Sequence, residues 1–173
     1  MWPRARRRSR GRPTLRRLLG QAGNSRLLSR SVRVGDIEFE DVRAEGALEE
    51  AERARERAYA PYSRFNMGAA VVTERDAVVP GALVENVSLG LAMCAERAAL
   101  FSVVAQDLGK PESSWLVAPR TSGELTWPCG ARLQVAMELG GSELLVVASD
   151  GSGDVAQARL HELASRLPFK SAR

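Results

Sequence analysis

The sequence has few residues that support redox or metal chemistry: among its 173 residues are only two cysteines and one histidine. Two cysteines cannot build the disulfide framework of a small secreted protein. No apolar run approaches the roughly 20 residues that a transmembrane helix needs. With 45% hydrophobic and 27% charged residues, the composition is that of one ordinary folded domain.

Acidic residues are absent from the first 35 positions, which hold eleven arginines, and the first acid is Asp36. The remaining positions hold 14 of the 25 basic residues and all 21 acidic ones, a net charge of −7, although the whole chain carries +4. We therefore predict a basic, disordered leader over residues 1–35 and a single domain over residues 36–173. The acidic domain disfavours nucleic acid as a partner, except through the leader.

Three interpretations of the leader are open. Its Arg- and Ser-rich composition is typical of organelle targeting peptides, and it also suits an arm that binds polyanions. The third interpretation is an extension upstream of the true start, without function, which we favour. No apolar segment of a secretory signal follows the charges, so we expect a cytoplasmic protein with no membrane association.

Hydrophobic periodicity predicts an α/β domain. Helices are expected at residues 47–59, 91–107, 129–139 and 156–167, and strands at residues 67–73, 78–84, 115–118 and 143–149. Strands separated by helices indicate a mixed sheet covered on both faces, so we predict a three-layer α/β/α fold with about five strands.

Two short segments carry the candidate chemistry. Cys94-Ala95-Glu96-Arg97 opens the predicted central helix, and Pro128-Cys129-Gly130-Ala131 opens the next one. A helix N-terminus stabilises a thiolate, and two thiolates on neighbouring helices can hold one zinc ion. Glu96 lies two residues beyond a ligand, within reach of metal-bound water, which is the layout of zinc nucleobase and nucleoside deaminases. The alternative is two cysteines that only begin two helices.

Further sequence blocks surround these two segments. In chain order they are Ala58-Tyr59-Ala60-Pro61-Tyr62-Ser63-Arg64-Phe65, Gly68-Ala69-Ala70, Val84-Glu85-Asn86-Val87-Ser88 and Gln134-Val135. With the two cysteine segments they closely resemble the cytidine deaminase family, from about residue 46 to residue 169. The resemblance implies that cytidine or deoxycytidine is hydrolysed to uridine or deoxyuridine in pyrimidine salvage, with one zinc ion per chain. It also implies a homo-oligomer, commonly a tetramer, that acts on a free nucleoside.

The resemblance also assigns roles to individual residues. Glu96 is the proton shuttle, acting as general base and then as general acid. Cys94 and Cys129 are zinc ligands, and Arg97 offsets thiolate charge near the metal. The expected substrate-binding residues are Phe65, which packs against the base, Glu85, which binds ribose, and Ala95.

One departure from the family pattern affects the metal. The family motif Pro-Cys-x-x-Cys ends here in Arg132, which stays protonated and has no lone pair for a metal. A catalytic zinc ion normally has three protein ligands, and we do not expect His161, the only histidine, to be one. Two thiolates and two waters would hold zinc more weakly. Alternatively, the guanidinium takes the metal's place as a structural cation, which predicts an inactive protein retained for oligomerisation or regulation.

A second departure affects the substrate. Leu83 stands where the family often has a ribose-binding Asn, and losing such a hydrogen bond costs about 1–3 kcal/mol. This weakens cytidine binding or indicates another aminopyrimidine nucleoside as substrate.

Overall fold

The computed structural model of the chain describes residues 32–34, 37–39 and 43–164. Its elements, in chain order, are β1 (Val32–Val34), β2 (Ile37–Phe39), α1 (Arg43–Glu56), β3 (Gly68–Thr73), β4 (Val78–Ala82), the 3₁₀ turn η2 (Leu89–Leu91), α2 (Ala95–Ala105), β5 (Pro111–Val117), α3 (Gly130–Gly140), β6 (Leu145–Ser149), β7 (Val155–Arg159) and α4 (Leu160–Leu163). Apart from β1, the predicted leader lies outside the described residues.

A five-stranded mixed sheet forms the centre of the fold, with strand order β4-β3-β5-β6-β7. β5 and β6 run parallel and the other neighbouring pairs run antiparallel. The short strands β1 and β2 form a separate antiparallel pair. The prediction of a mixed sheet of about five strands is confirmed.

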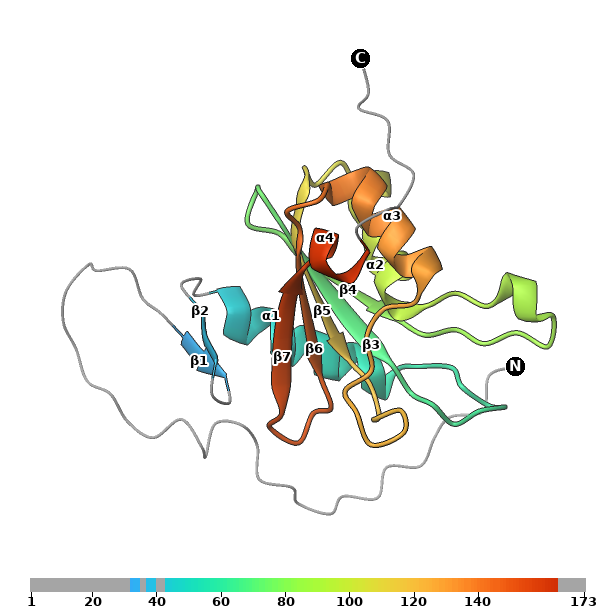
Figure 1. The fold of residues 1–173 in the computed structure, drawn as a ribbon. Coiled ribbons are helices and arrows are strands. Elements are labelled where there is room, and N and C mark those ends of the chain that lie inside the picture. The colour runs from blue at the N-terminus through green and yellow to red at the C-terminus, as the bar shows by residue number, and fades with distance from the viewer. Residues whose placement is uncertain (1–31, 35–36, 40–42, 165–173) are drawn as a thin grey trace.

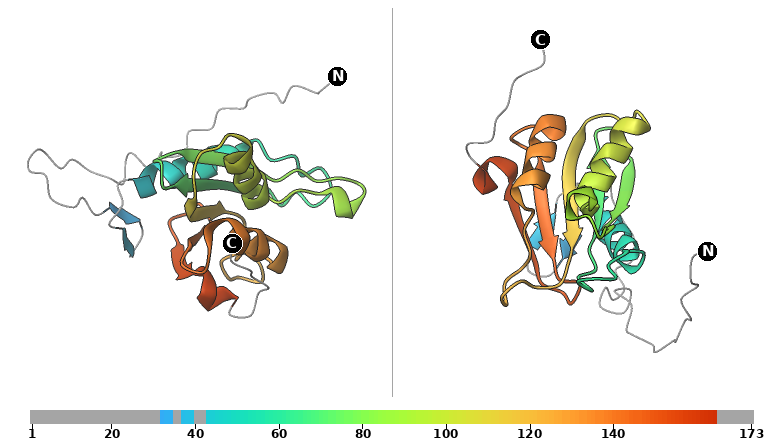
Figure 2. Two further views of the ribbon diagram at one scale, coloured as in Figure 1. Left: turned by 90° about the horizontal axis from the view of Figure 1, so that it is seen from above. Right: turned by 90° about the vertical axis from the view of Figure 1, so that its right-hand side faces the viewer.

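Helices cover both faces of this sheet, as Figures 1 and 2 show. Along β3, Ala70 and Val72 pack with α1 on one face, whereas Val71 packs with α2 and α3 on the other. This alternation follows from the two-residue period of a strand. The predicted three-layer α/β/α architecture is therefore confirmed.

Two glycines allow the helices to lie close to the sheet. A Cβ atom added at Gly68 would lie 2.1 Å from the backbone oxygen of Ala51 in α1, and one added at Gly81 would lie 2.2 Å from the backbone oxygen of Ala95 in α2. Both distances are far below a van der Waals contact. Gly81 thus positions the first turn of α2, which begins at the candidate site.

The prediction of a helix over residues 156–167 is wrong for most of that segment. Residues 155–159 form β7, which pairs antiparallel with β6 after the turn at Asp150, and only residues 160–163 are helical. The Ala-Gln-Ala-Arg segment at positions 156–159 favours a helix locally, but β6 offers an edge whose backbone hydrogen bonds outweigh that preference. The predicted residues 165–167 lie outside the described residues.

Other boundaries also differ. The first helix spans Arg43–Glu56 rather than 47–59, and β5 spans Pro111–Val117 rather than 115–118. α2 spans Ala95–Ala105 rather than 91–107. Leu89–Leu91 instead forms a 3₁₀ turn on a loop that extends away from the body (Figure 1). β1, in the segment expected to be disordered, pairs with β2. Within the described residues no helix is long and apolar enough to span a bilayer.

Candidate functional site

Cys94 and Cys129 stand immediately before α2 and α3, two helices on the same face of the sheet. Each residue has extended backbone angles, and its carbonyl oxygen accepts a helical hydrogen bond, at 3.0 Å from the amide of Ala98 and of Leu133 respectively. The Cys94 sulfur does not cap its own helix. Both cysteines therefore lie at the start of a helix, on one side of the sheet.

Glu96 and Arg132 form a buried ion pair between these two helices. Arg132 Nη1 donates to Glu96 Oε1 at 2.8 Å, with only 2% of Glu96 and 8% of Arg132 exposed. The other carboxylate oxygen, Oε2, is buried without a hydrogen-bond partner among the described residues. The residue in the third-ligand position thus contacts the residue expected to move protons.

The rest of the guanidinium holds the segment before α3. Arg132 Nε donates to Cys129 Sγ at 3.4 Å, and Nη2 lies 3.5 Å from the carbonyl oxygen of Trp127. Arg132 therefore connects the start of α2 with residues 127 to 129. The sequence indicated a structural cation among the two thiolates and the Glu96 carboxylate, but not the contact with Trp127.

The electrostatic environment follows from burial and from Arg132. Burial raises the pKa of the Glu96 carboxyl, and the nearby Arg132 charge opposes that rise. Burial also raises the pKa of the Cys94 thiol, again with Arg132 acting in the opposite direction. At Cys129 burial acts to raise the pKa, but hydrogen bonds from the side chain and backbone of Arg132 contribute to a net lowering. One guanidinium thus acts on all three acidic groups.

The expected substrate residues lie on the same side of the sheet. Ala95 and Leu83 belong to one buried apolar cluster, against which Phe65 packs. Glu85 instead contacts the loop before β3: its carboxylate accepts from the amide of Tyr62 at 2.9 Å and from the Ser63 hydroxyl. These bonds, led by that of the Ser63 hydroxyl, lower the pKa of Glu85. The sequence also left open that Glu85 only caps a turn, and these contacts are of that kind.

Two further residues were considered at the sequence level: Arg97, which was expected to offset thiolate charge, and His161, which was not expected to be a metal ligand. The Arg97 guanidinium lies over the Phe101 ring, 5.7 Å from its centroid, and its Nε is buried without a hydrogen-bond partner among the described residues. His161 Nδ1 instead lies 3.3 Å from the backbone oxygen of Ser142, at the start of α4. His161 therefore has its contacts on another part of the surface.

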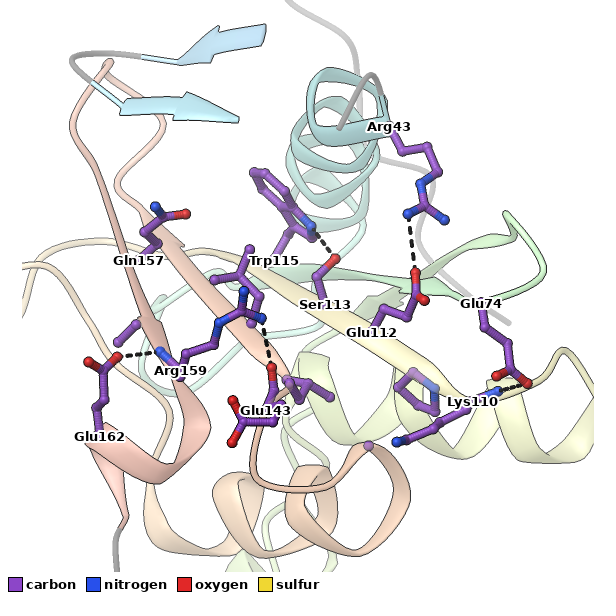
Figure 3. Close-up of a pocket in the computed structure, with 15 residues that line it drawn as sticks. Arg43, Glu74, Lys110, Glu112, Ser113, Trp115, Glu143, Gln157, Arg159 and Glu162 are labelled. Atoms are coloured by element: carbon purple, nitrogen blue, oxygen red, sulfur yellow. Dashed lines mark hydrogen bonds and ion pairs between the residues drawn. The ribbon is translucent and has the colours of Figure 1, made fainter. Parts of the chain in front are cut away.

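A groove of about 850 Å³ lies elsewhere, on the face of the sheet that α1 covers in part, and it contains none of the predicted site residues. Figure 3 shows its charged rim, where Arg43 pairs with Glu112 at 3.1 Å, and Trp115 Nε1 donating to Ser113 Oγ at 2.9 Å. Its basic and acidic side chains largely pair with one another or with backbone groups. It supplies no constellation comparable to that around Glu96.

Comparison with known proteins identifies the family. The model of the cytidine and deoxycytidylate deaminase zinc-binding region matches residues 42–148. The chain belongs to the cytidine deaminase family. A cytidine deaminase of Halalkalibacterium halodurans is 38% identical over 116 residues, which cover 67% of this chain and 86% of that protein.

Solved structures of cytidine deaminases agree with the fold. The crystal structure from Burkholderia pseudomallei gives a TM-score of 0.67 at 42% identity and covers 72% of this chain and 98% of that one. The structure from Mycobacterium tuberculosis gives a TM-score of 0.62 at 36% identity, covering 73% and 98%. The resemblance predicted from the sequence motifs is thus confirmed.

The residues of this chain do not fit the zinc ion that the cytidine deaminase family implies. Among the described residues, no group of three or more His, Cys, Asp or Glu side chains is placed to hold a metal. Two thiols are present, and the third position carries a guanidinium that already contacts Cys129 and Glu96. Because a guanidinium is always protonated and donates all its hydrogen bonds, it competes with a cation for both partners.

Proposed function

We propose that this chain is a cytidine deaminase family protein whose hydrolytic activity is absent or strongly impaired. The observation that carries the proposal is the 2.8 Å contact between Arg132 and Glu96. A general base and acid must gain and release a proton during each turnover. Arg132 holds a permanent cation against Oε1 of that carboxylate, so one of the two oxygens that must exchange the proton is already engaged, although burial keeps the pKa of Glu96 raised.

The nucleoside remains the ligand class that we propose for the site. Phe65 and Ala95 retain the types expected to contact a base, and they lie at one apolar cluster. Leu83 is 9% exposed and belongs to that same cluster, so it offers no hydrogen bond to a sugar. This favours a pyrimidine nucleoside with fewer sugar hydroxyls over cytidine itself. Equilibrium binding tests this preference: dideoxycytidine should bind most tightly and cytidine most weakly, with deoxycytidine between them. Equal affinities for the three would contradict the role of Leu83.

The proposal retains a homo-oligomer and a cytoplasmic location. Exposed Phe101 and Val104 on α2 border an apolar groove of about 420 Å³ between α2 and α3, and exposed apolar surface of this kind marks association sites. Light scattering on the purified chain tests the assembly, and a monomer at micromolar concentration would contradict it. Cell fractionation of the full chain tests the location.

Restoring the third thiolate tests the proposed loss of activity. Cytidine turnover and zinc content are measured for the wild type, for Arg132→Cys and for the matched control Arg132→Ser, which removes the guanidinium without supplying a thiolate. We expect Arg132→Cys to hold about one zinc ion per chain and to raise turnover at least ~100-fold, because a third protein ligand completes a catalytic zinc site. We expect little zinc and little turnover for the other two.

A wild type that holds about one zinc ion and turns over cytidine as fast as Arg132→Cys would overturn the proposal. The result would mean that two thiolates suffice, and the full deaminase activity that the sequence resemblance implies would then be assigned to this chain, with Glu96 as its proton shuttle.

A further inference from the structure

We propose that Arg132 is a resident cation: it replaces a metal ion as the tie between the first turns of α2 and α3, and it makes the fold independent of metal. This inference rests on the placement of Arg132 in the third-ligand position, but it concerns stability rather than turnover. It requires that the guanidinium join both helices, that it be buried, and that its removal leave a charge without a partner.

The contacts of Arg132 meet the first requirement. The side chain begins in the first turn of α3 and reaches Glu96 in the first turn of α2, a residue 36 positions earlier in the sequence. Its Nε contacts Cys129 Sγ, and Nη2 approaches the carbonyl oxygen of Trp127. A single cation therefore contacts the same two helix starts that a shared metal ion would join.

The guanidinium is also buried, and its removal would leave a charge without a partner. The Arg132 side chain is 9% exposed and that of Glu96 is 2% exposed. Since Glu96 Oε2 has no hydrogen-bond partner among the described residues, Arg132 is the side chain there that compensates the Glu96 charge. Removing one partner of a buried pair leaves an uncompensated charge, whereas removing both removes that penalty. The two residues must then be strongly non-additive.

The same contacts disfavour a metal beside the guanidinium. Arg132 shares Cys129 with any ion at this place, and the two positive charges repel each other over the short distance set by that shared sulfur. A resident guanidinium and a bound zinc ion are therefore alternatives. Metal-binding experiments on the wild type and on Arg132→Cys separate them without any measurement of activity.

A double-mutant cycle in the full-length chain tests the tie. Thermal unfolding is measured for the wild type, Glu96→Gln, Arg132→Met and the double variant, with Arg53→Met as the control from the exposed pair with Glu50. We expect each single variant at the buried pair to lower Tm by roughly 10 °C, and the double variant to recover at least half of that loss. The control should change Tm by no more than about 2 °C.

Additive losses in the double variant would refute the tie. If a single variant fails to fold, recovery of folded protein in the double variant supports the inference, and a double variant that also fails to fold overturns it. These results do not depend on turnover, so an active wild type would end the proposed loss of function while leaving this cycle to be decided by its own result.

Metal dependence gives a second, independent measurement. The Tm of the wild type should stay within about 1 °C after treatment with a chelator or with excess zinc, whereas zinc should raise the Tm of Arg132→Cys by about 5 °C or more. A wild-type Tm that falls by about 5 °C on chelation would show that a metal, and not Arg132, ties the two helices.

Discussion

A methyl group at Gly81 tests whether the close contact between β4 and α2 positions the candidate site. In Gly81→Ala the new Cβ would lie 2.2 Å from the backbone oxygen of Ala95 and 2.5 Å from the backbone nitrogen of Ala99. Both atoms belong to the α2 backbone, so no flexible side chain can turn away to relieve the overlap. The helix must move away from the sheet or the strand must bend.

The cost follows from the depth of this overlap. A comfortable carbon–oxygen contact is about 3.3 Å or more, so the helix must shift by roughly 1 Å. Overpacking of this kind typically costs about 1–3 kcal/mol, occasionally more, and rigid backbone on both sides places Gly81→Ala at the upper end. A loss of about 3 kcal/mol lowers Tm by roughly 6–12 °C in a chain of this size.

The assay is urea unfolding monitored by circular dichroism, with Gly46→Ala as the matched control. Gly46 lies in α1, where an added Cβ meets no atom within 4 Å. Because alanine has the higher helix propensity, the control should stabilise the chain by about 0.5–1 kcal/mol. The same substitution thus has opposite expected signs at the two positions.

Equal stability of Gly81→Ala and the wild type would refute the reasoning. It would show that α2 can move away from β4 at no cost, and that its place is not set by this contact. A loss of stability in the Gly46→Ala control would instead show that the effect comes from glycine itself rather than from the contact with Ala95.

Two further predictions concern carboxylates in loops, those of Asp150 and Glu85. Partial burial acts to raise the pKa of Asp150, but hydrogen bonds from Ser152 and the pairing with Arg120 lower it overall, so its contribution is full above the unfolded pKa of about 3.9 and is lost as pH falls through the folded pKa. Urea unfolding should show Asp150→Asn less stable than the wild type at pH 7, with the difference closing toward pH 2; parallel profiles would contradict the lowered pKa. Glu85→Gln should speed hydrogen exchange of the Tyr62 and Ser63 amides, which donate to the Glu85 carboxylate, while global stability changes little. Unchanged exchange of the peptide that contains them would show that Glu85 does not hold this loop.

Local patterns predicted the elements whose residues determine their own structure. The strand expected at residues 67–73 is β3, Gly68–Thr73, and the helix expected at 129–139 is α3, Gly130–Gly140. β3 is a short continuous apolar run that is buried along its whole length, and α3 is an apolar segment that lies between Pro128 and Gly141. β7 was missed because its structure depends on an edge supplied by β6, a non-local contact that the Ala-rich segment does not encode by itself.

The candidate site shows the same division. Cys94, Glu96 and Arg132 were found because short motifs place them at helix starts, where chemistry and local geometry coincide. The partner of Arg132 depends on how two helices pack across 36 residues of sequence. Likewise, the direction in which Glu85 points depends on a loop that lies 22 residues earlier in the sequence. Residue types indicated the possible chemistry, and packing determined which contacts form.

Packing also explains how one residue could change the chemistry of the site without a change of fold. α2 and α3 are held by an apolar cluster that includes Leu100, Leu133 and Val146, and Gly81 sets the distance of α2 from the sheet. None of these contacts involves a thiol or a carboxylate. The helix starts therefore remain opposite each other when a ligand residue is replaced, and a buried Glu96 between them still requires a positive partner. An arginine at position 132 supplies that partner from within the chain, and under the proposed function it satisfies the buried carboxylate without a metal ion.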